Sequence, residues 1–138
     1  VMGRITYEQV LDFGDWPYPD HDVYVLSRAP IDGMPERTFA WSGTPEELSA
    51  HLAERGLEGD CWLIGGGQTI REFERLGSVD EYEVFVMPVW LGTGVPLVPA
   101  PFPAGDLELR DVTAWENGVV RLLYGRGGED ETTAFEKD

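Results

Sequence analysis

The chain has 138 residues, of which 42% are apolar and 12% aromatic, and this composition is that of a globular domain with an ordinary core. Its 26 acidic and 10 basic side chains give a net charge of -16, which repels nucleic acids and anionic membranes, so neither is an expected partner. No apolar stretch approaches the roughly 20 residues that cross a bilayer and no signal peptide stands at the start, which favours a cytoplasmic protein.

The basic side chains are almost all arginine, and Lys137 is the single lysine. An acidic surface with so little lysine is similar to that of proteins from salt-loving archaea, in which concentrated cations screen the self-repulsion. An acidic protein from a non-halophilic organism has the same pattern, and both interpretations stay open.

The chain begins with an abrupt junction between a strand and a helix. Val1 and Met2 are typical of the end of a strand whose beginning is absent, and Gly3 and Arg4 lead into a helix over residues 4–13. Residues 21–28 and 61–67 are short apolar runs ended by turn residues, which predicts strands that are buried on both faces. Cys61 is accordingly expected to be a buried structural thiol.

Two helices follow from local signals. Residues 42–56 carry Thr44 as N-cap, Pro45 at the first helical position, Glu47 to close a capping box, and Gly56 after the end. Residues 68–77 predict a second helix, which begins directly after three glycines. Strands that alternate with helices imply parallel pairing with right-handed crossovers.

The last third of the chain has a different pattern. Residues 81–98 predict a long strand followed by a loop with glycines, and residues 107–126 predict two strands joined around Asn117-Gly118. Residues 127–138 are rich in Gly, Glu, Asp and Thr, which is typical of an acidic tail. We therefore expect one α/β domain over residues 1–126.

A glycine between a strand and a helix occurs twice, at residues 2–6 and 64–69. Helix N-termini carry unpaired N–H groups and a partial positive charge, and glycine lets a phosphate approach them closely. Two such ends that face each other would hold a pyrophosphate. The alternative is that the glycines only form tight turns, since neither junction matches the full Rossmann or Walker pattern.

The motifs "VMGRITYE", "VYVLSR" and "WLIGGGQTI" occur in an order and spacing that resembles the dihydrofolate reductase superfamily. The stretch "VDEYEVFVMPVWLGTGVPLV" is similar to the branch that includes the C-terminal reductase domain of the bifunctional riboflavin-biosynthesis deaminase-reductase. The resemblance implies a dihydrofolate reductase-like three-layer fold, with a mostly parallel central sheet and an antiparallel C-terminal hairpin. Members of the family begin with a further strand and a mobile loop, which this chain lacks.

The resemblance also implies a binding site for NADPH. The helix start at residues 3–6 would face the cofactor's phosphates, the strand end at Ser27-Arg28 would receive the 2'-phosphate, and residues 64–69 would hold the pyrophosphate near the nicotinamide. The residues assigned to the cofactor in this way are Gly3, Arg4, Thr6, Ser27, Arg28, Ile64, Gly65, Gly66, Gly67, Gln68 and Thr69. For Arg4 and Arg28 the alternative is a surface ion pair, since acids are abundant.

The activity implied by the resemblance is hydride transfer from NADPH to a pyrimidine or pterin-like heterocycle, as in 5-amino-6-(5-phosphoribosylamino)uracil reductase. Dihydrofolate reduction and a nucleotide-binding module without catalysis are the alternatives. A small heterocyclic substrate and a second copy in a homodimer are the expected partners, and the apolar C-terminal strands support the dimer.

Several residues have both a possible functional role and an ordinary structural one. Asp12 and Asp15 are typical turn acids, so no catalytic proton donor is assigned. His21 and His51 lie 30 residues apart without further ligands, so no metal site is expected. Arg71 and Arg75, on the helix after the glycines, would serve a substrate phosphate or form a solvated helix face.

Three aromatic residues that follow the first helix also keep two interpretations. Phe13, Trp16 and Tyr18 either line a substrate pocket or cover the sheet edge.

Overall fold

The structure is a computed structural model that describes residues 1–56 and 59–127. Val1–Ser78 and Val95–Pro103 form one compact unit, which we call the parallel unit. Val79–Gly94 and the residues from Ala104 onward form a second, the antiparallel unit. Nearly all of the expected acidic tail, residues 128–138, lies outside the described residues.

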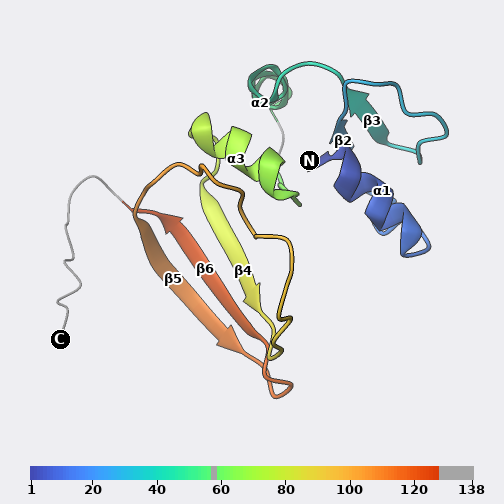
Figure 1. Cartoon of the computed structure of the whole chain (residues 1–138). Coiled ribbons are helices and arrows are strands. Elements are labelled where there is room, and N and C mark those ends of the chain that lie inside the picture. The colour runs from blue at the N-terminus through green and yellow to red at the C-terminus, as the bar shows by residue number, and fades with distance from the viewer. Residues whose placement is uncertain (57–58, 128–138) are drawn as a thin grey trace, which may run out of the picture. The chain divides into compact units, whose positions relative to one another are not determined.

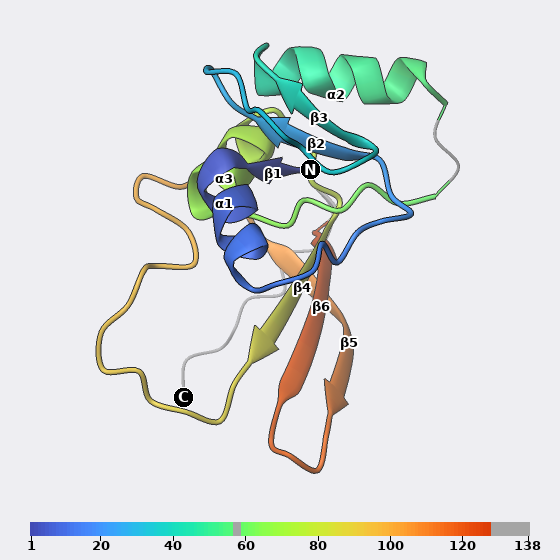
Figure 2. The same cartoon turned by 90° about the vertical axis from the view of Figure 1, so that its right-hand side faces the viewer.

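The parallel unit is built on a three-stranded sheet in the order β1-β2-β3, formed by β1 (Met2–Gly3), β2 (Val23–Leu26) and β3 (Thr38–Trp41). Both pairings are parallel, with Met2 opposite Val25 and Tyr24 opposite Phe39. The helices are α1 (Arg4–Asp12), α2 (Pro45–Glu54) and α3 (Gly67–Arg75). Figures 1 and 2 show α1 and α2 on opposite faces of this sheet.

Helices cover both faces of β2, and this explains why "VYVL" is continuously apolar. Val23 and Val25 are buried in one cluster with Met2 and with Tyr7 of α1. Tyr24 points to the other face, because side chains alternate along a strand, and its ring lies 5.7 Å from that of His51 on α2. The sheet is therefore the middle of three layers.

The capping box predicted for α2 is confirmed. The Thr44 hydroxyl accepts a hydrogen bond from the Glu47 N–H at 3.2 Å, and the Glu47 carboxylate accepts one from the Thr44 N–H at 2.8 Å. The predicted helix after the glycines is also confirmed, and its Phe73 is buried. The strand β3 was not predicted, although it contains the short apolar run Phe39–Trp41, and two of its four residues are exposed.

The expected buried strand at residues 61–67 is wrong as a regular element. Residues 61–64 run beside β1, where the Val1 N–H donates to the Trp62 carbonyl at 2.6 Å and the Ile64 N–H donates to the Val1 carbonyl at 2.9 Å. Gly65 forms only an isolated bridge with Met2. Cys61 is exposed and Trp62 is 69% exposed, so Cys61 is not the buried thiol that we expected. The segment pairs with the sheet along one edge only, so these side chains stay exposed to solvent.

The antiparallel unit is a three-stranded sheet in the order β4-β6-β5, from β4 (Glu81–Val86), β5 (Leu107–Ala114) and β6 (Val120–Arg126). The hairpin predicted around Asn117-Gly118 joins β5 and β6. Gly118 adopts a φ of +84°, which favours glycine, and its N–H donates to the Trp115 carbonyl at 2.9 Å. The order of parallel strands followed by an antiparallel hairpin is confirmed, although the strands form two separate sheets rather than one.

Strand register gives the antiparallel sheet two unlike faces. One face, which we call the apolar face, carries Tyr82, Val84, Val86, Leu109, Val112, Ala114, Val120, Leu122 and Tyr124. The opposite face carries ion pairs, in which Arg121 contacts Glu83 and Asp111. Within the described residues, no helix is long and apolar enough to span a membrane.

Candidate functional site

The starts of α1 and α3 lie next to each other in the parallel unit. The Gly3 N–H donates to the Gly65 carbonyl at 3.0 Å, which holds the two glycine junctions together. A Cβ atom on Gly3 would lie 2.7 Å from the Thr69 hydroxyl, so the first turn of α3 leaves no room for a side chain there. The two junctions that the sequence singled out therefore form one site.

At both helix starts, no side chain caps the free backbone N–H groups. The N-cap of α1 is Gly3 and that of α3 is Gly66, and neither supplies a capping side chain. Neither helix has an acidic residue in its first turn. In a chain with 26 acids this leaves two positive helix ends side by side without a neutralising carboxylate, which is a suitable arrangement for an anion.

The three consecutive glycines serve different purposes. Gly65 has a φ of +115°, a conformation that other residues rarely adopt. Gly67 has no room for a side chain, because a Cβ would lie 2.9 Å from the Leu97 carbonyl oxygen and 2.8 Å from the Pro99 ring. Gly66 is different, since its backbone is extended and exposed. The only atom near a Cβ there would be the Thr6 hydroxyl, at 3.4 Å.

Protein packing therefore does not require glycine at position 66. The bare backbone of Gly66 lies between the helix starts, with the half-buried Thr6 and Thr69 on α1 and α3. Two hydroxyls and the N–H groups of two first turns form a donor set that matches phosphate oxygens. These residues fit a dinucleotide pyrophosphate. Gln68 and Ile64 flank this space as exposed side chains.

Arg4 connects the helix starts to the end of β2. Its guanidinium forms an ion pair with Glu8 at 2.7 Å and donates a longer hydrogen bond, 3.4 Å, to the Ser27 hydroxyl. Ser27 is buried and donates its own hydroxyl proton to the Ala29 carbonyl at 2.6 Å. The surface ion pair considered for Arg4 is thus present, and it holds the guanidinium beside the end of β2.

Arg28 has a different environment. It is exposed, and among the described residues it forms no ion pair or hydrogen bond. Other arginines in the same part of the chain do form ion pairs, for example Arg4, Arg37, Arg55, Arg71, Arg110 and Arg121. The described residues therefore give no support to the ion-pair interpretation of Arg28, which leaves a guanidinium at the end of β2 for an external anion.

The remaining candidates lie away from this site or have structural contacts. Trp16 and Tyr18 pack against the core cluster, which favours the interpretation that they cover the sheet, while Phe13 is 88% exposed. His51 lies against Trp41, with ring centroids 5.0 Å apart. No three acidic, histidine or cysteine side chains gather as metal ligands in the ranges that the structure describes.

One ionic cluster in the parallel unit has no signal in the sequence. Asp22 accepts hydrogen bonds from Arg37 at 2.9 Å and from Arg55 at 3.0 Å, and Arg55 also donates to the Tyr24 hydroxyl. The hydrogen bond from Arg37 is the main reason why the pKa of Asp22 is below its usual value. The contact joins residues far apart in the chain, so no local spacing could have indicated it.

A parallel sheet between helices, with two glycine-led helix starts at one edge, agrees with the dihydrofolate reductase-like α/β class that the sequence motifs resemble. The family model for the RibD C-terminal domain matches residues 30–121, and the chain belongs to this family. An uncharacterised Bacillus subtilis protein, YwjB, is 32% identical over 91% of this chain and 72% of its own length. A second one, YyaP, is 36% identical over 76% of this chain and 55% of its own length.

Solved structures share the fold. A Shewanella sp. PV-4 protein named for riboflavin biosynthesis superposes with a TM-score of 0.79 at 29% identity, covering 92% of this chain and 72% of that one. A pyrimidine reductase-like protein from Corynebacterium diphtheriae gives a TM-score of 0.56 at 18% identity, covering 78% of this chain and 50% of its own. RibD from Acinetobacter baumannii gives 0.57 at 18% identity, over 91% of this chain and 46% of its own, so these two show the fold alone.

Proposed function

We propose that this chain is a reductase that binds NADPH across the starts of α1 and α3 and supports hydride transfer to a pyrimidine or pterin-like heterocycle. The observation that carries the proposal is the bare backbone of Gly66 between two uncapped helix starts, at a position where packing does not require glycine. Membership of the RibD C-terminal domain family and the likeness to a protein named for riboflavin biosynthesis support a reductase of the riboflavin type.

The cofactor and the protein would contribute different parts of the reaction. The dihydronicotinamide supplies the hydride when the cofactor is bound, and the chain binds and orients it. The helix starts would hold the pyrophosphate with N–H groups and with the hydroxyls of Thr6 and Thr69. Their unneutralised positive ends offset the repulsion that a chain of net charge -16 exerts on an anionic cofactor.

The preference for NADPH over NADH is assigned to Arg28. The pyrophosphate is common to both cofactors, so the helix starts do not distinguish them. A guanidinium without a protein partner at the end of β2 is a suitable receptor for the 2'-phosphate, and the adjacent Arg4 and Ser27 lie within hydrogen-bond distance of each other. An NAD-type site would place a carboxylate at this position to bind the ribose hydroxyls, and "SRAP" contains none.

Two alternative functions would use the same cofactor site. Dihydrofolate reduction would use the same cofactor site with a different substrate, and a binding module without catalysis would retain only the cofactor affinity. Oxidation of NADPH that depends on an added heterocycle distinguishes the enzyme from the binding module. Comparison of a phosphoribosylamino-pyrimidine with dihydrofolate as that heterocycle distinguishes the two reductases.

The cofactor assignment is tested by titration of NADPH and NADH at one fixed high salt concentration. The proteins are the wild type, Arg28→Ala, and Arg110→Ala, which removes the same charge from an exposed ion pair with Glu81 in the antiparallel unit. A charged hydrogen bond of about 1.5 to 3 kcal/mol corresponds to a loss of roughly tenfold or more in affinity. We expect Arg28→Ala to lose this factor for NADPH and to leave NADH almost unchanged, and Arg110→Ala to change neither.

The outcomes separate the parts of the proposal. Equal wild-type affinity for the two cofactors, or an equal loss for both in Arg28→Ala, refutes the role of Arg28. Binding of neither cofactor by the wild type refutes the cofactor site as a whole.

A further inference from the structure

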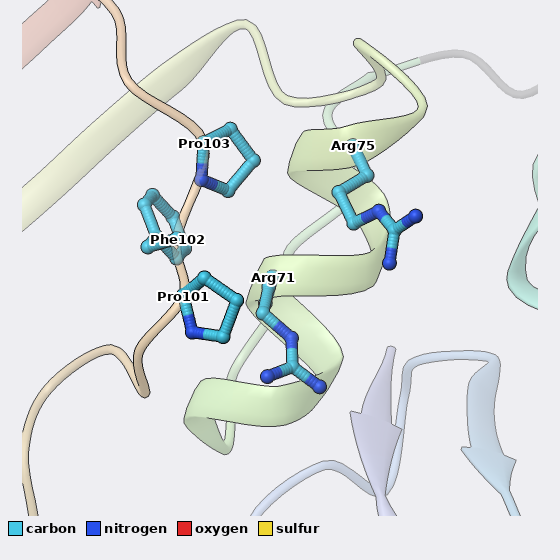
Figure 3. A pocket seen from close by; sticks show the side chains of 5 residues that line it. All are labelled: Arg71, Arg75, Pro101, Phe102 and Pro103. Carbon is cyan, nitrogen blue, oxygen red and sulfur yellow. The ribbon is translucent and has the colours of Figure 1, made fainter.

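The helix α1 begins with a cation, which its dipole disfavours. Arg4 is the first residue of α1, at the end that carries the partial positive charge. The other helices differ from α1 in this respect. The first turn of α2 contains Glu46 and Glu47, as the dipole favours. The first turn of α3 is uncharged, and Figure 3 shows its arginines, Arg71 and Arg75, projecting from the side of the helix. The position of Arg4 therefore has a local energetic cost.

Glu8 offsets this cost from the next turn of α1. Its carboxylate accepts a hydrogen bond from the Nε of Arg4 at 2.7 Å, four residues away on the same helix face. The side chains of Arg4 and Glu8 are 41% and 55% exposed, and a pair so open to solvent adds little to the stability of the fold. The main consequence of the contact is therefore the place in which it holds the guanidinium.

The contact with Glu8 determines which donors of Arg4 stay available. Glu8 takes the Nε proton, and the Ser27 hydroxyl accepts from Nη1 at 3.4 Å. Ser27 is fixed in turn, because it is buried and donates to the Ala29 carbonyl at 2.6 Å. Within the described residues the Nη2 group of Arg4 has no partner, so it is left for an external ligand near the end of β2. Without Glu8, only the long bond to Ser27 would restrain a flexible side chain.

We propose that Glu8 is a positioning residue for recognition of the 2'-phosphate of NADPH. It acts through Arg4, which it holds by Nε so that Nη2 stays free near the end of β2. The inference rests on the proposed cofactor site, and it adds a residue that itself touches no part of the cofactor. Glu8 also carries a negative charge, which repels a phosphate. Its hydrogen bond and its charge therefore act on NADPH affinity in opposite directions.

Two substitutions of Glu8 separate the hydrogen bond from the charge. Glu8→Gln and Glu8→Ala both remove the charge, and only Gln keeps an oxygen that accepts from the Nε of Arg4. Both variants and the wild type are titrated with NADPH and NADH at one fixed high salt concentration. Glu8→Ala should bind NADPH roughly two- to tenfold more weakly than Glu8→Gln, which is the factor for one hydrogen bond. The two variants should bind NADH equally.

The matched control is the same pair of substitutions at Glu81. This residue forms an exposed ion pair with Arg110 in the antiparallel unit. Glu81→Gln and Glu81→Ala should therefore bind NADPH equally. A difference between them as large as the one at Glu8 would show a general effect of the substitution and overturn the proposal.

Two further measurements show whether Glu8 acts through Arg4. In an Arg4→Ala background, the difference between Gln and Ala in place of Glu8 should vanish, as a double-mutant cycle requires for a residue that acts through its partner. In the protein without cofactor, NMR relaxation of the Arg4 Nε–H group should report a rigid group in the wild type and in Glu8→Gln, and a mobile one in Glu8→Ala.

The outcomes distinguish the role of Glu8 from the cofactor site itself. Equal NADPH affinity of Glu8→Gln and Glu8→Ala, in a wild type that binds NADPH, overturns the role of Glu8 alone. A difference that is equally large for NADH, or that survives in the Arg4→Ala background, does the same. Binding of neither cofactor by the wild type refutes the proposed function, whereas the NMR measurement still decides whether Glu8 holds Arg4 in place.

Discussion

The parallel and antiparallel units bury their apolar side chains to very different degrees. Every buried apolar side chain among the described residues lies in the parallel unit, where helices cover both faces of β2. In the described part of the antiparallel unit, Gly125 is the one buried residue, and Val112 and Leu109 are about half exposed, at 52% and 50%. A parallel sheet needs cover on both faces, whereas an antiparallel sheet can leave one face open.

The difference assigns separate tasks to the two units. The helix starts of the candidate site are attached to a buried core, so their backbone donors are held in fixed positions, as binding of a phosphate requires. The antiparallel sheet instead presents an apolar face of a kind that is typical of association. We propose that the covered unit binds the cofactor and that the open one contacts a second copy of the chain.

The largest expected effect is on the free energy of unfolding, and it compares a leucine of the buried core with a leucine of the apolar face. Leu48 on α2 is fully buried, so Leu48→Ala should lower the free energy of unfolding by about 2 to 5 kcal/mol. Leu109→Ala removes a half-exposed side chain and should cost about 1 kcal/mol or less. Urea unfolding of both variants and the wild type, with a shared slope, measures the two losses. Equal losses would show that the apolar face is as well covered as the core.

The next effect concerns the apolar face itself. If a second copy covers it, Val112→Glu places a charge in the contact and should shift the protein to monomers with a mass of 15.4 kDa, while the wild type has about twice that mass. Thr113→Glu is the control, because Thr113 points to the opposite face, where it pairs with Arg121. Light scattering coupled to size-exclusion chromatography measures the mass of each protein. A wild type that elutes as a monomer contradicts the homodimer.

Elements with local signals were predictable from the sequence. The α2 helix follows from Thr44 and Glu47, which satisfy each other's backbone, and the β5–β6 hairpin follows from Asn117-Gly118. The strand β3 offers only a four-residue stretch of β-forming residues, and its place in the sheet, like the open edge at Cys61, depends on which neighbours pair with it. Propensity describes a segment alone, and pairing across the sheet decides these cases.

The candidate site shows the same limit at the level of single residues. Gly65, Gly66 and Gly67 are identical in the sequence, yet one is required by its φ, one by contact with Leu97 and Pro99, and one by neither. The contact between Gly3 and Thr69 likewise joins distant segments. The sequence therefore predicted which glycine junctions form the candidate site, whereas the separate roles of their residues depend on contacts that only the fold creates.

The smallest expected effect on stability comes from removing one ion pair in each unit. Two arginines contact Asp22 in the parallel unit, and the hydrogen bond from Arg37 together with the charges of Arg37 and Arg55 keeps the pKa of Asp22 low. In the antiparallel unit Glu81 contacts Arg110 alone, and both side chains are about half exposed. Asp22→Asn should cost up to about 1 kcal/mol at pH 7, and Glu81→Gln should cost almost nothing, because an exposed pair contributes little.

The pH dependence distinguishes the Asp22 cluster from a general effect of charge. A carboxylate whose pKa is lower in the folded state than in the unfolded chain stabilises the fold fully above its unfolded pKa, about 4. That contribution is lost as the pH falls through the folded pKa. The difference in unfolding free energy between wild type and Asp22→Asn should therefore be constant from pH 7 to about pH 5 and shrink steadily below about pH 4. Urea unfolding at a series of pH values measures it. A difference that stays the same down to pH 2.5, or an equal one for Glu81→Gln, would mean that the two arginines do not hold Asp22 ionised.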